Sequence, residues 1–177
     1  MPNVRRPAAF SRPTVMIIAG EASGDAHGAK LVRAIARKDP RIGFAGIGGE
    51  RMAAAGVELV FDASDLSVVG LTEVLSRAGS ILRGISSAKR LLRRRPDLLI
   101  LVDYPEFNLH IAAYAKKLGI PVLFYISPQI WAWRSGRVHK IGRRIDHMAV
   151  ILPFEEAFYR RHGIPATFVG HPLMDGG

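Results

Sequence analysis

The segment that decides the fold is Leu98–Asn108, which reads LLILVDYPEFN. Five consecutive apolar residues, Leu98–Val102, lead to a single carboxylate at Asp103, and a proline follows two residues later. A run that is apolar at every position is typical of a strand buried on both faces, as in a parallel sheet. Ligands of open α/β sheets bind just beyond the carboxyl ends of such strands, so Asp103 is a candidate functional residue. A second interpretation stays open, in which Asp103 only caps the following helix.

Strands and helices are expected to alternate along the whole chain. This alternation predicts a doubly wound α/β fold with a mostly parallel sheet of about six or seven strands. Residues 1–12 are expected to form a variable or disordered lead-in, and residues 13–177 a single Rossmann-like domain. The expected strands are Thr14–Ala19, Ile42–Ile47, Val57–Phe61, Leu98–Val102, Val122–Ile126, His147–Leu152 and Thr167–Val169. The expected helices run from Ser23 or Asp25 to Lys38, and over 50–55, 72–95, 107–118 and 155–162.

The composition is that of a folded, basic protein without cysteine. Apolar residues make up 49% of the 177 residues and charged residues 23%, which suits one domain with a sizeable core. Lys and Arg number 25 against 15 Asp and Glu, and the resulting charge of +10 favours anionic partners. The absence of cysteine excludes disulfides and thiolate metal sites. The sequence has neither a signal-peptide pattern nor a span of about 18 apolar residues, so we expect a cytoplasmic location.

Two glycine-rich turns, at residues 20–28 and 46–49, are each predicted to join a strand to a helix. Neither has the spacing of a P-loop or of a dinucleotide-binding fingerprint. Glycine allows close approach to a ligand, and the start of a helix favours phosphate, so these turns suit a phosphate or sugar-nucleotide cradle. Glu21 and Asp25 would repel a polyphosphate and would instead suit the hydroxyl groups of a sugar. The alternative is that the turns serve only the fold.

The segment Leu71–Arg95 is strongly basic, with seven Lys and Arg against Glu73 alone. Apolar residues are interleaved with the charges, which is typical of a helix lying on an anionic membrane surface. An ordinary crossover helix with a solvated basic face gives the same pattern, so both interpretations stay open. Nucleic acid is not an expected partner, because no nucleic-acid-binding module accompanies the charges. The expected membrane contacts are Val69, Leu71, Val74, Leu75, Ile81 and Leu82.

A segment with two tryptophans, Ser127–Arg134, follows the predicted strand Val122–Ile126. The tryptophans and Arg134 suit the rim of a ligand pocket, although core packing of the indole rings is an alternative. The histidines show no metal-binding spacing, and we expect no metal site. Among them only His171, between Gly170 and Pro172 at a strand end, is placed well for function, and a structural hydrogen bond is the alternative role for it.

Seven segments, taken in order, resemble the lipid-A-disaccharide synthase family. They are AGEASGD at 19–25, GIGG with Arg51-Met52 at 46–52, LSVVGLTEVL at 66–75, VDYPEFN at 102–108, SP with WAWR at 127–134, LPFE at 152–155 and FVGHPL at 168–173. The resemblance implies the GT-B glycosyltransferase fold, with two Rossmann-like halves facing a cleft. It implies transfer of diacylglucosamine from UDP to diacylglucosamine 1-phosphate, which inverts the anomeric carbon and gives a β(1→6) disaccharide phosphate and UDP. It also implies no cofactor or obligatory metal, since the UDP-sugar is a substrate.

The same resemblance assigns roles to individual residues. The family's catalytic aspartate maps onto Asp103, which would act as the general base toward the acceptor 6-hydroxyl. An enzyme of this kind would bind acylated glucosamine phosphate and a UDP-sugar, and would lie peripherally on the anionic inner membrane. The expected substrate-binding residues are Glu21, Ser23, Gly24, Asp25, Gly48, Gly49, Asn108, Ser127, Trp131 and Arg134.

This sequence departs from the family pattern in two residues and in length. Glu106 stands where the family usually has aspartate, and Gln129 where it often has a small residue. Members run to roughly twice this length, so the chain matches the N-terminal, acceptor-side half, and we expect it to be inactive without a UDP-sugar-binding half. The alternatives are half of another GT-B enzyme, half of a UDP-sugar epimerase, or a basic membrane-surface module without catalysis.

Overall fold

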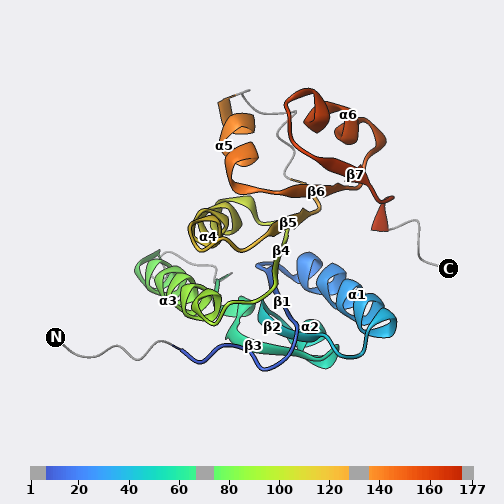
Figure 1. Ribbon diagram of the computed structural model, residues 1–177. Coiled ribbons are helices and arrows are strands. Elements are labelled where there is room, and N and C mark those ends of the chain that lie inside the picture. The colour runs from blue at the N-terminus through green and yellow to red at the C-terminus, as the bar shows by residue number, and fades with distance from the viewer. Residues whose placement is uncertain (1–6, 67–73, 128–135, 173–177) are drawn as a thin grey trace.

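The computed structural model describes residues 7–66, 74–127 and 136–172. In this part of the chain seven parallel strands form one sheet in the order β3-β2-β1-β4-β5-β6-β7, which confirms the predicted doubly wound fold (Figure 1). The strands are β1 (Thr14–Ala19), β2 (Gly43–Gly48), β3 (Val57–Asp62), β4 (Leu98–Val102), β5 (Val122–Tyr125), β6 (His147–Val150) and β7 (Ala166–Phe168). The helices are α1 (Ala22–Lys38), α2 (Glu50–Ala54), η1 (Ala63–Leu66), α3 (Val74–Arg93), α4 (Pro105–Lys117), α5 (Gly136–Arg144) and α6 (Pro153–Arg161).

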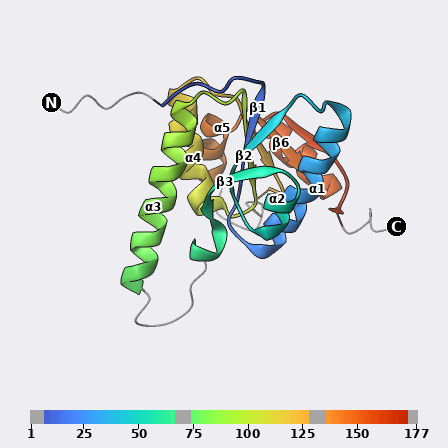
Figure 2. The same ribbon diagram turned by 90° about the horizontal axis from the view of Figure 1, so that it is seen from below.

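The continuous apolar strands β1 and β4 are buried because helices cover both faces of the sheet. Alternate residues of β4 enter different cores: Leu99 and Leu101 pack with residues of α3–α6, and Ile100 and Val102 with residues of α1 and α2. Successive side chains of a strand point to opposite faces, so a strand between two helical layers needs apolar residues at every position. Figures 1 and 2 show these two layers of helices around the central strands.

The strand order reverses between β1 and β4. These two strands pair in parallel, with Ala19 opposite Val102, but their chains continue into helices on opposite faces of the sheet. In a doubly wound fold such a switch point opens a crevice at the carboxyl edge. The loop that carries Glu21 and the loop that carries Asp103 therefore leave the sheet side by side.

Two helices begin earlier than the sequence predicts because a proline starts each of them. The predicted helix 107–118 begins at Pro105, and the predicted helix 155–162 begins at Pro153. Proline is favoured in the first turn of a helix, since its ring presets the helical φ angle and the first N–H groups need no intrahelical acceptor. The other predicted boundaries lie within about two residues of those observed.

The expected disordered lead-in is wrong for the residues in it that the structure describes. Phe10 packs against the larger core cluster, and the guanidinium of Arg94 lies 4.0 Å from the centre of its ring. Arg94 also donates a hydrogen bond from Nε to the carbonyl of Ala8. A cation stacked on an aromatic face stabilises the contact, so this segment is fixed against the carboxyl end of α3.

Helix α3 behaves as a crossover helix at its carboxyl end. Leu91 and Leu92 are buried in the core. Ile81 packs partly buried against the same core, and its expected membrane contact stays a prediction. Leu82 is 66% exposed, in agreement with its expected accessibility. Figure 2 shows the amino-terminal end of α3 extending beyond the sheet.

The structure gives less information on the other four expected membrane contacts. Val69 and Leu71 fall outside the described residues, and of Val74 and Leu75 the structure gives only their place in the first turn of α3. Within the described residues, no helix combines the length and the apolar character needed to cross a bilayer.

Candidate active site

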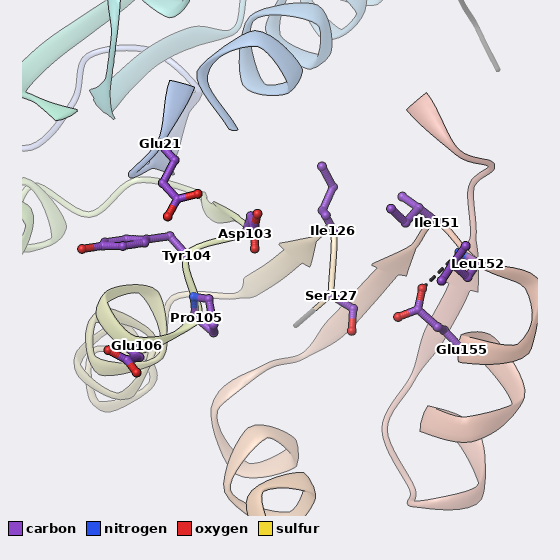
Figure 3. Close-up of a pocket in the computed structure, with 10 residues that line it drawn as sticks. All are labelled: Glu21, Asp103, Tyr104, Pro105, Glu106, Ile126, Ser127, Ile151, Leu152 and Glu155. Carbon is purple, nitrogen blue, oxygen red and sulfur yellow. Dashed lines mark hydrogen bonds between the residues drawn. The ribbon is translucent and has the colours of Figure 1, made fainter. Parts of the chain in front are cut away.

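A pocket of about 430 Å³ lies at the carboxyl ends of β1, β4, β5 and β6. Asp103 and its neighbours form one wall, and residues that follow β5 and β6 form the other (Figure 3). This is the position that the switch point of the sheet predicts for a ligand. The lining residues are Glu21, Asp103, Tyr104, Pro105, Glu106, Ile126, Ser127, Ile151, Leu152 and Glu155.

The backbone of this pocket is strained. Among the described residues four non-glycine residues have positive φ, and three of them, Asp103 (50°), Tyr104 (48°) and Ile126 (64°), line the pocket. Left-handed backbone is costly for residues with a β-carbon, and most of all for a β-branched one such as Ile126. Strain of this kind persists only where the surrounding structure holds it, and it concentrates at functional sites.

Asn108 is part of what holds the strained backbone. Its Nδ2 donates hydrogen bonds to the carbonyl of Asp103 at 2.7 Å and to that of Val102 at 3.4 Å. The side chain is completely buried within α4, so the expected direct contact with substrate is wrong. The carboxamide instead anchors the backbone at the end of β4 through these two hydrogen bonds. The cap interpretation of Asp103 is also wrong, because Tyr104 is the N-cap of α4 and no side chain caps that end.

Gly20 allows β1 and the Asp103 loop to approach closely. A β-carbon at this position would lie 2.3 Å from Cδ1 of Tyr104. Any other residue would therefore displace the Tyr104 ring, which also packs 6.0 Å from that of Phe107. Glycine is therefore needed at this position, because the ring of Tyr104 packs directly against its backbone.

The pocket is acidic. Four carboxylates line it, and no Lys or Arg is among its described lining residues. Figure 3 shows the carboxylates of Glu21 and Asp103 near each other on one side, and that of Glu155 on the other. Like charges repel strongly where water is partly excluded, so this volume disfavours a phosphate group and suits a neutral or cationic group.

A second hollow of about 610 Å³ adjoins the first and shares Glu21 with it. Ser23 and Gly49, both expected to bind substrate, line this hollow together with Arg51. The first glycine-rich turn therefore faces two neighbouring cavities. Within the described residues, no cluster of three or more side chains could bind a metal ion.

Asp25 has a structural role that its sequence position did not indicate. It is 7% exposed and accepts hydrogen bonds from the backbone N–H groups of Gly49 (2.8 Å), Arg51 (3.1 Å) and Met52 (3.0 Å). The expected capping of its own helix is wrong, because Glu21 is the N-cap of α1 and no side chain caps that end. Asp25 instead caps α2 from a distance, and it occupies the N–H groups that a phosphate cradle would need. Asp25 also lines the second hollow, so its expected contact with sugar hydroxyls stays a prediction.

Gly24 and Gly48 are packing residues, which corrects their assignment to substrate. A β-carbon on Gly24 would lie 3.3 Å from that of Ala19, and one on Gly48 would lie 2.4 Å from Sδ of Met52. Both glycines are buried. For these two glycines, the alternative interpretation that the turns serve only the fold is the correct one.

Ser127, an expected substrate-binding residue, lines the pocket. Two residues near it, Glu155 and Tyr159, were not predicted from the sequence. Its hydroxyl forms a hydrogen bond with the hydroxyl of Tyr159, which is fully buried on α6. Burial raises the pKa of Tyr159 above its usual range, and the nearby charge of Glu155 adds to this effect. The LPFE segment gave a weak signal for Glu155, whereas Tyr159 looked like any apolar residue of an amphipathic helix. Trp131 and Arg134 lie outside the described residues.

His27, on α1, senses the charge of Asp103. Burial lowers the pKa of His27 below 6.5, Lys30 and His171 lower it further, and Asp103 raises it. We expect Asp103→Asn to lower the pKa of His27 and His171→Gln to raise it, as measured by NMR titration of the imidazole C–H signals. The control is Asp97→Asn, at the opposite end of β4, which should leave this pKa unchanged. An unaltered His27 titration in the Asp103 variant would contradict the electrostatic contact.

The sequence profile of one family, described as Lipid-A-disaccharide synthetase, matches residues 15–176. Curated relatives named lipid-A-disaccharide synthase are 57% identical over 162 residues in Geobacter metallireducens, 58% over 169 in Trichlorobacter lovleyi and 49% over 167 in Coxiella burnetii. These alignments cover 91–94% of this chain but 42–44% of the relatives, so the chain spans about two fifths of their length.

Solved structures share the fold at low identity. MurG of Acinetobacter baumannii superimposes with a TM-score of 0.53 at 17% identity, covering 79% of this chain and 41% of that protein. A UGT transferase of Siraitia grosvenorii in complex with UDP gives a TM-score of 0.56 at 11% identity, covering 89% and 50%. These likenesses confirm the predicted Rossmann-like fold of the chain. The profile match over almost the entire chain, together with relatives at 49–58% identity, shows that this chain belongs to the lipid-A-disaccharide synthetase family.

Proposed function

We propose that this chain is the acceptor-side, base-bearing part of an inverting glycosyltransferase. The reaction transfers 2,3-diacylglucosamine from its UDP ester to the 6-hydroxyl of 2,3-diacylglucosamine 1-phosphate. One glycosidic C–O bond forms, the bond between the anomeric carbon and UDP breaks, and UDP leaves with the electron pair. The UDP-sugar is a substrate, and the proposed reaction needs no cofactor or metal.

Asp103 is the proposed general base, and its place in the pocket is the observation that carries the proposal. Its carboxylate lies half-buried at the switch point of the sheet. The backbone that carries it is strained, and a hydrogen bond from Asn108 to the carbonyl of Asp103 anchors that backbone. There it takes the proton of the attacking hydroxyl as the new bond forms. A positioned base of this kind contributes roughly 10²–10⁴-fold in rate. The other pocket carboxylates favour the positive charge that develops on the donor sugar.

The UDP moiety is proposed to bind to a second half, which the relatives' greater length can supply. The acidic pocket supports this division, because it disfavours a diphosphate. The test joins residues 1–177 to the carboxyl-terminal part of the Geobacter metallireducens relative and measures UDP release. The chimera should turn over the acylated acceptor far faster than unacylated glucosamine 1-phosphate. The 177-residue chain alone should release no UDP above background, and turnover by it would contradict the division of roles.

A second proposal is that the chain lies on an anionic membrane through the layer formed by α3, α4 and α5. These helices contact one another in sequence order and lie side by side in Figure 1. They carry eleven Lys and Arg against one Glu, an excess of ten that equals the net charge of the whole chain. Leu82 stands exposed on the same layer. Basic charge beside exposed apolar side chains favours the interface of an anionic bilayer.

Leu82→Gln tests this membrane proposal. Loss of one apolar side chain from the interface should weaken partitioning onto phosphatidylglycerol vesicles by roughly tenfold or more in co-sedimentation, since full burial of a leucine is worth about 1.5–3 kcal/mol. Raising the salt concentration should weaken binding further. The matched control is Val169→Gln, an exposed apolar residue after β7 at 48% exposure, which should bind as the unaltered chain does. Equal partitioning of both variants and the unaltered chain would overturn the proposal.

A further inference from the structure

The pocket wall that faces Asp103 holds two buried polar side chains. Ser127 is 7% exposed and Glu155 is 2% exposed, yet both line the pocket. Figure 3 shows them on elements that follow β5 and β6, across the pocket from Asp103, with Ile126, Ile151 and Leu152 around them. A charge buried among apolar side chains is costly unless hydrogen bonds compensate it.

The two groups are held in place by bonds inside the protein. Oε1 of Glu155 accepts the N–H of Leu152 at 3.1 Å, and the backbone N–H of Glu155 donates to the carbonyl of Leu152, also at 3.1 Å. The hydroxyl of Ser127 is bound to that of Tyr159, on the next turn of α6 after Glu155. Two strands and one helix thus present a hydroxyl and a carboxylate in fixed orientation, as a binding wall requires.

The chemistry of this wall restricts what it binds. A carboxylate accepts hydrogen bonds only, and a serine hydroxyl can both donate and accept. With three more carboxylates in the pocket, an anionic group is disfavoured. The matching ligand is neutral and offers donor groups close together. Hydroxyl groups and the amide N–H of an acylated amino sugar fit this description.

We propose that Glu155 and Ser127 form a subsite that hydrogen-bonds the hydroxyl or amide groups of the acceptor sugar across the pocket from Asp103, with Tyr159 as the positioning residue for Ser127. This inference rests on the proposed function, because it assigns a binding position to the acceptor sugar of the proposed reaction. Two walls holding one sugar ring would fix the attacking hydroxyl against the base. The phosphate of the acceptor then lies outside the pocket.

Tyr159 acts through Ser127 and does not touch the ligand, because its ring and hydroxyl are fully buried. The raised pKa of Tyr159 keeps the phenol protonated, so it stays a neutral partner for the serine hydroxyl. Tyr159→Phe removes one oxygen and keeps the ring that fills the core. Its effect on binding should therefore appear only while Ser127 is present.

The competing interpretation is that Glu155 serves only the first turn of α6. Glu155→Gln separates the two roles, because the glutamine carbonyl still accepts the Leu152 N–H while the charge is lost. The urea midpoint of unfolding should then stay unchanged. The matched control is Glu58→Gln on the edge strand β3, an exposed residue that lines neither this pocket nor the adjoining hollow.

The experiment titrates N-acetylglucosamine 1-phosphate into the 177-residue chain and follows amide NMR shifts. Glu155→Gln and Ser127→Ala should each raise Kd at least fivefold, and Tyr159→Phe two- to fivefold, while the control stays within twofold. The double variant Ser127→Ala/Tyr159→Phe should match Ser127→Ala alone, which a merely structural role of Tyr159 would not produce.

Three results would overturn the subsite: wall variants that bind as the unaltered chain does, an unaltered chain that shows no saturable binding, or UDP binding that depends on Glu155. None of these results bears on Asp103 as the base, which is judged by turnover. Conversely, intact turnover in an Asp103 variant would contradict the role of Asp103 as the base. It would not affect a subsite that the binding measurements had established.

Discussion

Asp103→Asn is expected to lower kcat for disaccharide formation by roughly 10²–10⁴-fold, with little change in KM for the acceptor. The amide has the shape of the carboxylate but cannot take the proton of the attacking hydroxyl. Asparagine is also among the few residues that tolerate left-handed backbone, so the φ of 50° at this position is retained. The measurement is UDP release by the two-part chimera at saturating acceptor.

Two variants make this experiment specific. Asp103→Ala should lose as much activity but should also be less stable, because alanine is strained at this φ. Glu106→Gln, an exposed carboxylate of the same pocket, should retain most of the rate. Equal losses in the Glu106 and Asp103 variants would point to the summed charge of the pocket. Normal turnover by Asp103→Asn would remove the assigned base.

Asp25→Ala is expected to lower the free energy of unfolding by about 3–5 kcal/mol. The carboxylate accepts three backbone N–H groups at the start of α2, and its removal leaves all three without this acceptor, that of Met52 in a buried place and the other two in a partly buried one. Hydrogen bonds to a charged group are worth about 1.5–3 kcal/mol each, and their losses do not add fully. Such a loss is a large part of the stability of a single domain. The measurement is urea denaturation followed by circular dichroism.

The control for Asp25 is Asp97, whose carboxylate accepts one backbone N–H, from Thr14 at 2.9 Å. Asp97→Ala should cost about 1 kcal/mol. Asp25→Asn should fall between the two, since its single amide oxygen still accepts from Gly49 and Met52, which share Oδ1. A loss from Asp25→Ala no larger than from Asp97→Ala would show that water replaces the three bonds.

The sheet could be predicted from the sequence because its central strands obey one local rule. Leu98–Val102 is apolar at every position and Thr14–Ala19 at every position after the threonine, and both strands have the predicted bounds. The acid at the end of β4 was found for the same reason, since topology alone places strand ends at the crevice. The long stretch of basic residues interleaved with apolar ones also predicted α3, with an error of two residues at each end.

The roles of single side chains could not be predicted in this way, because their partners are distant in sequence. Asp25 caps a helix that begins 25 residues later, and no local pattern distinguishes this from capping its own helix. Asn108 looked like a ligand contact because it follows the catalytic candidate, yet one turn of α4 directs it into the core. Tyr159 pairs with a serine 32 residues earlier. Such partners are set by packing between elements.

The left-handed pair at the end of β4 also has a consequence for how this domain responds to selection. Glycine adopts such backbone freely, so replacing Tyr104 would release strain worth about 1–2 kcal/mol per residue. Screening for heat resistance would therefore reward changes at the very residues that orient the proposed base. We therefore expect stability and turnover to be opposed at this loop, and thermostabilised variants of this domain should be sought elsewhere, for example on the exposed surface of α1.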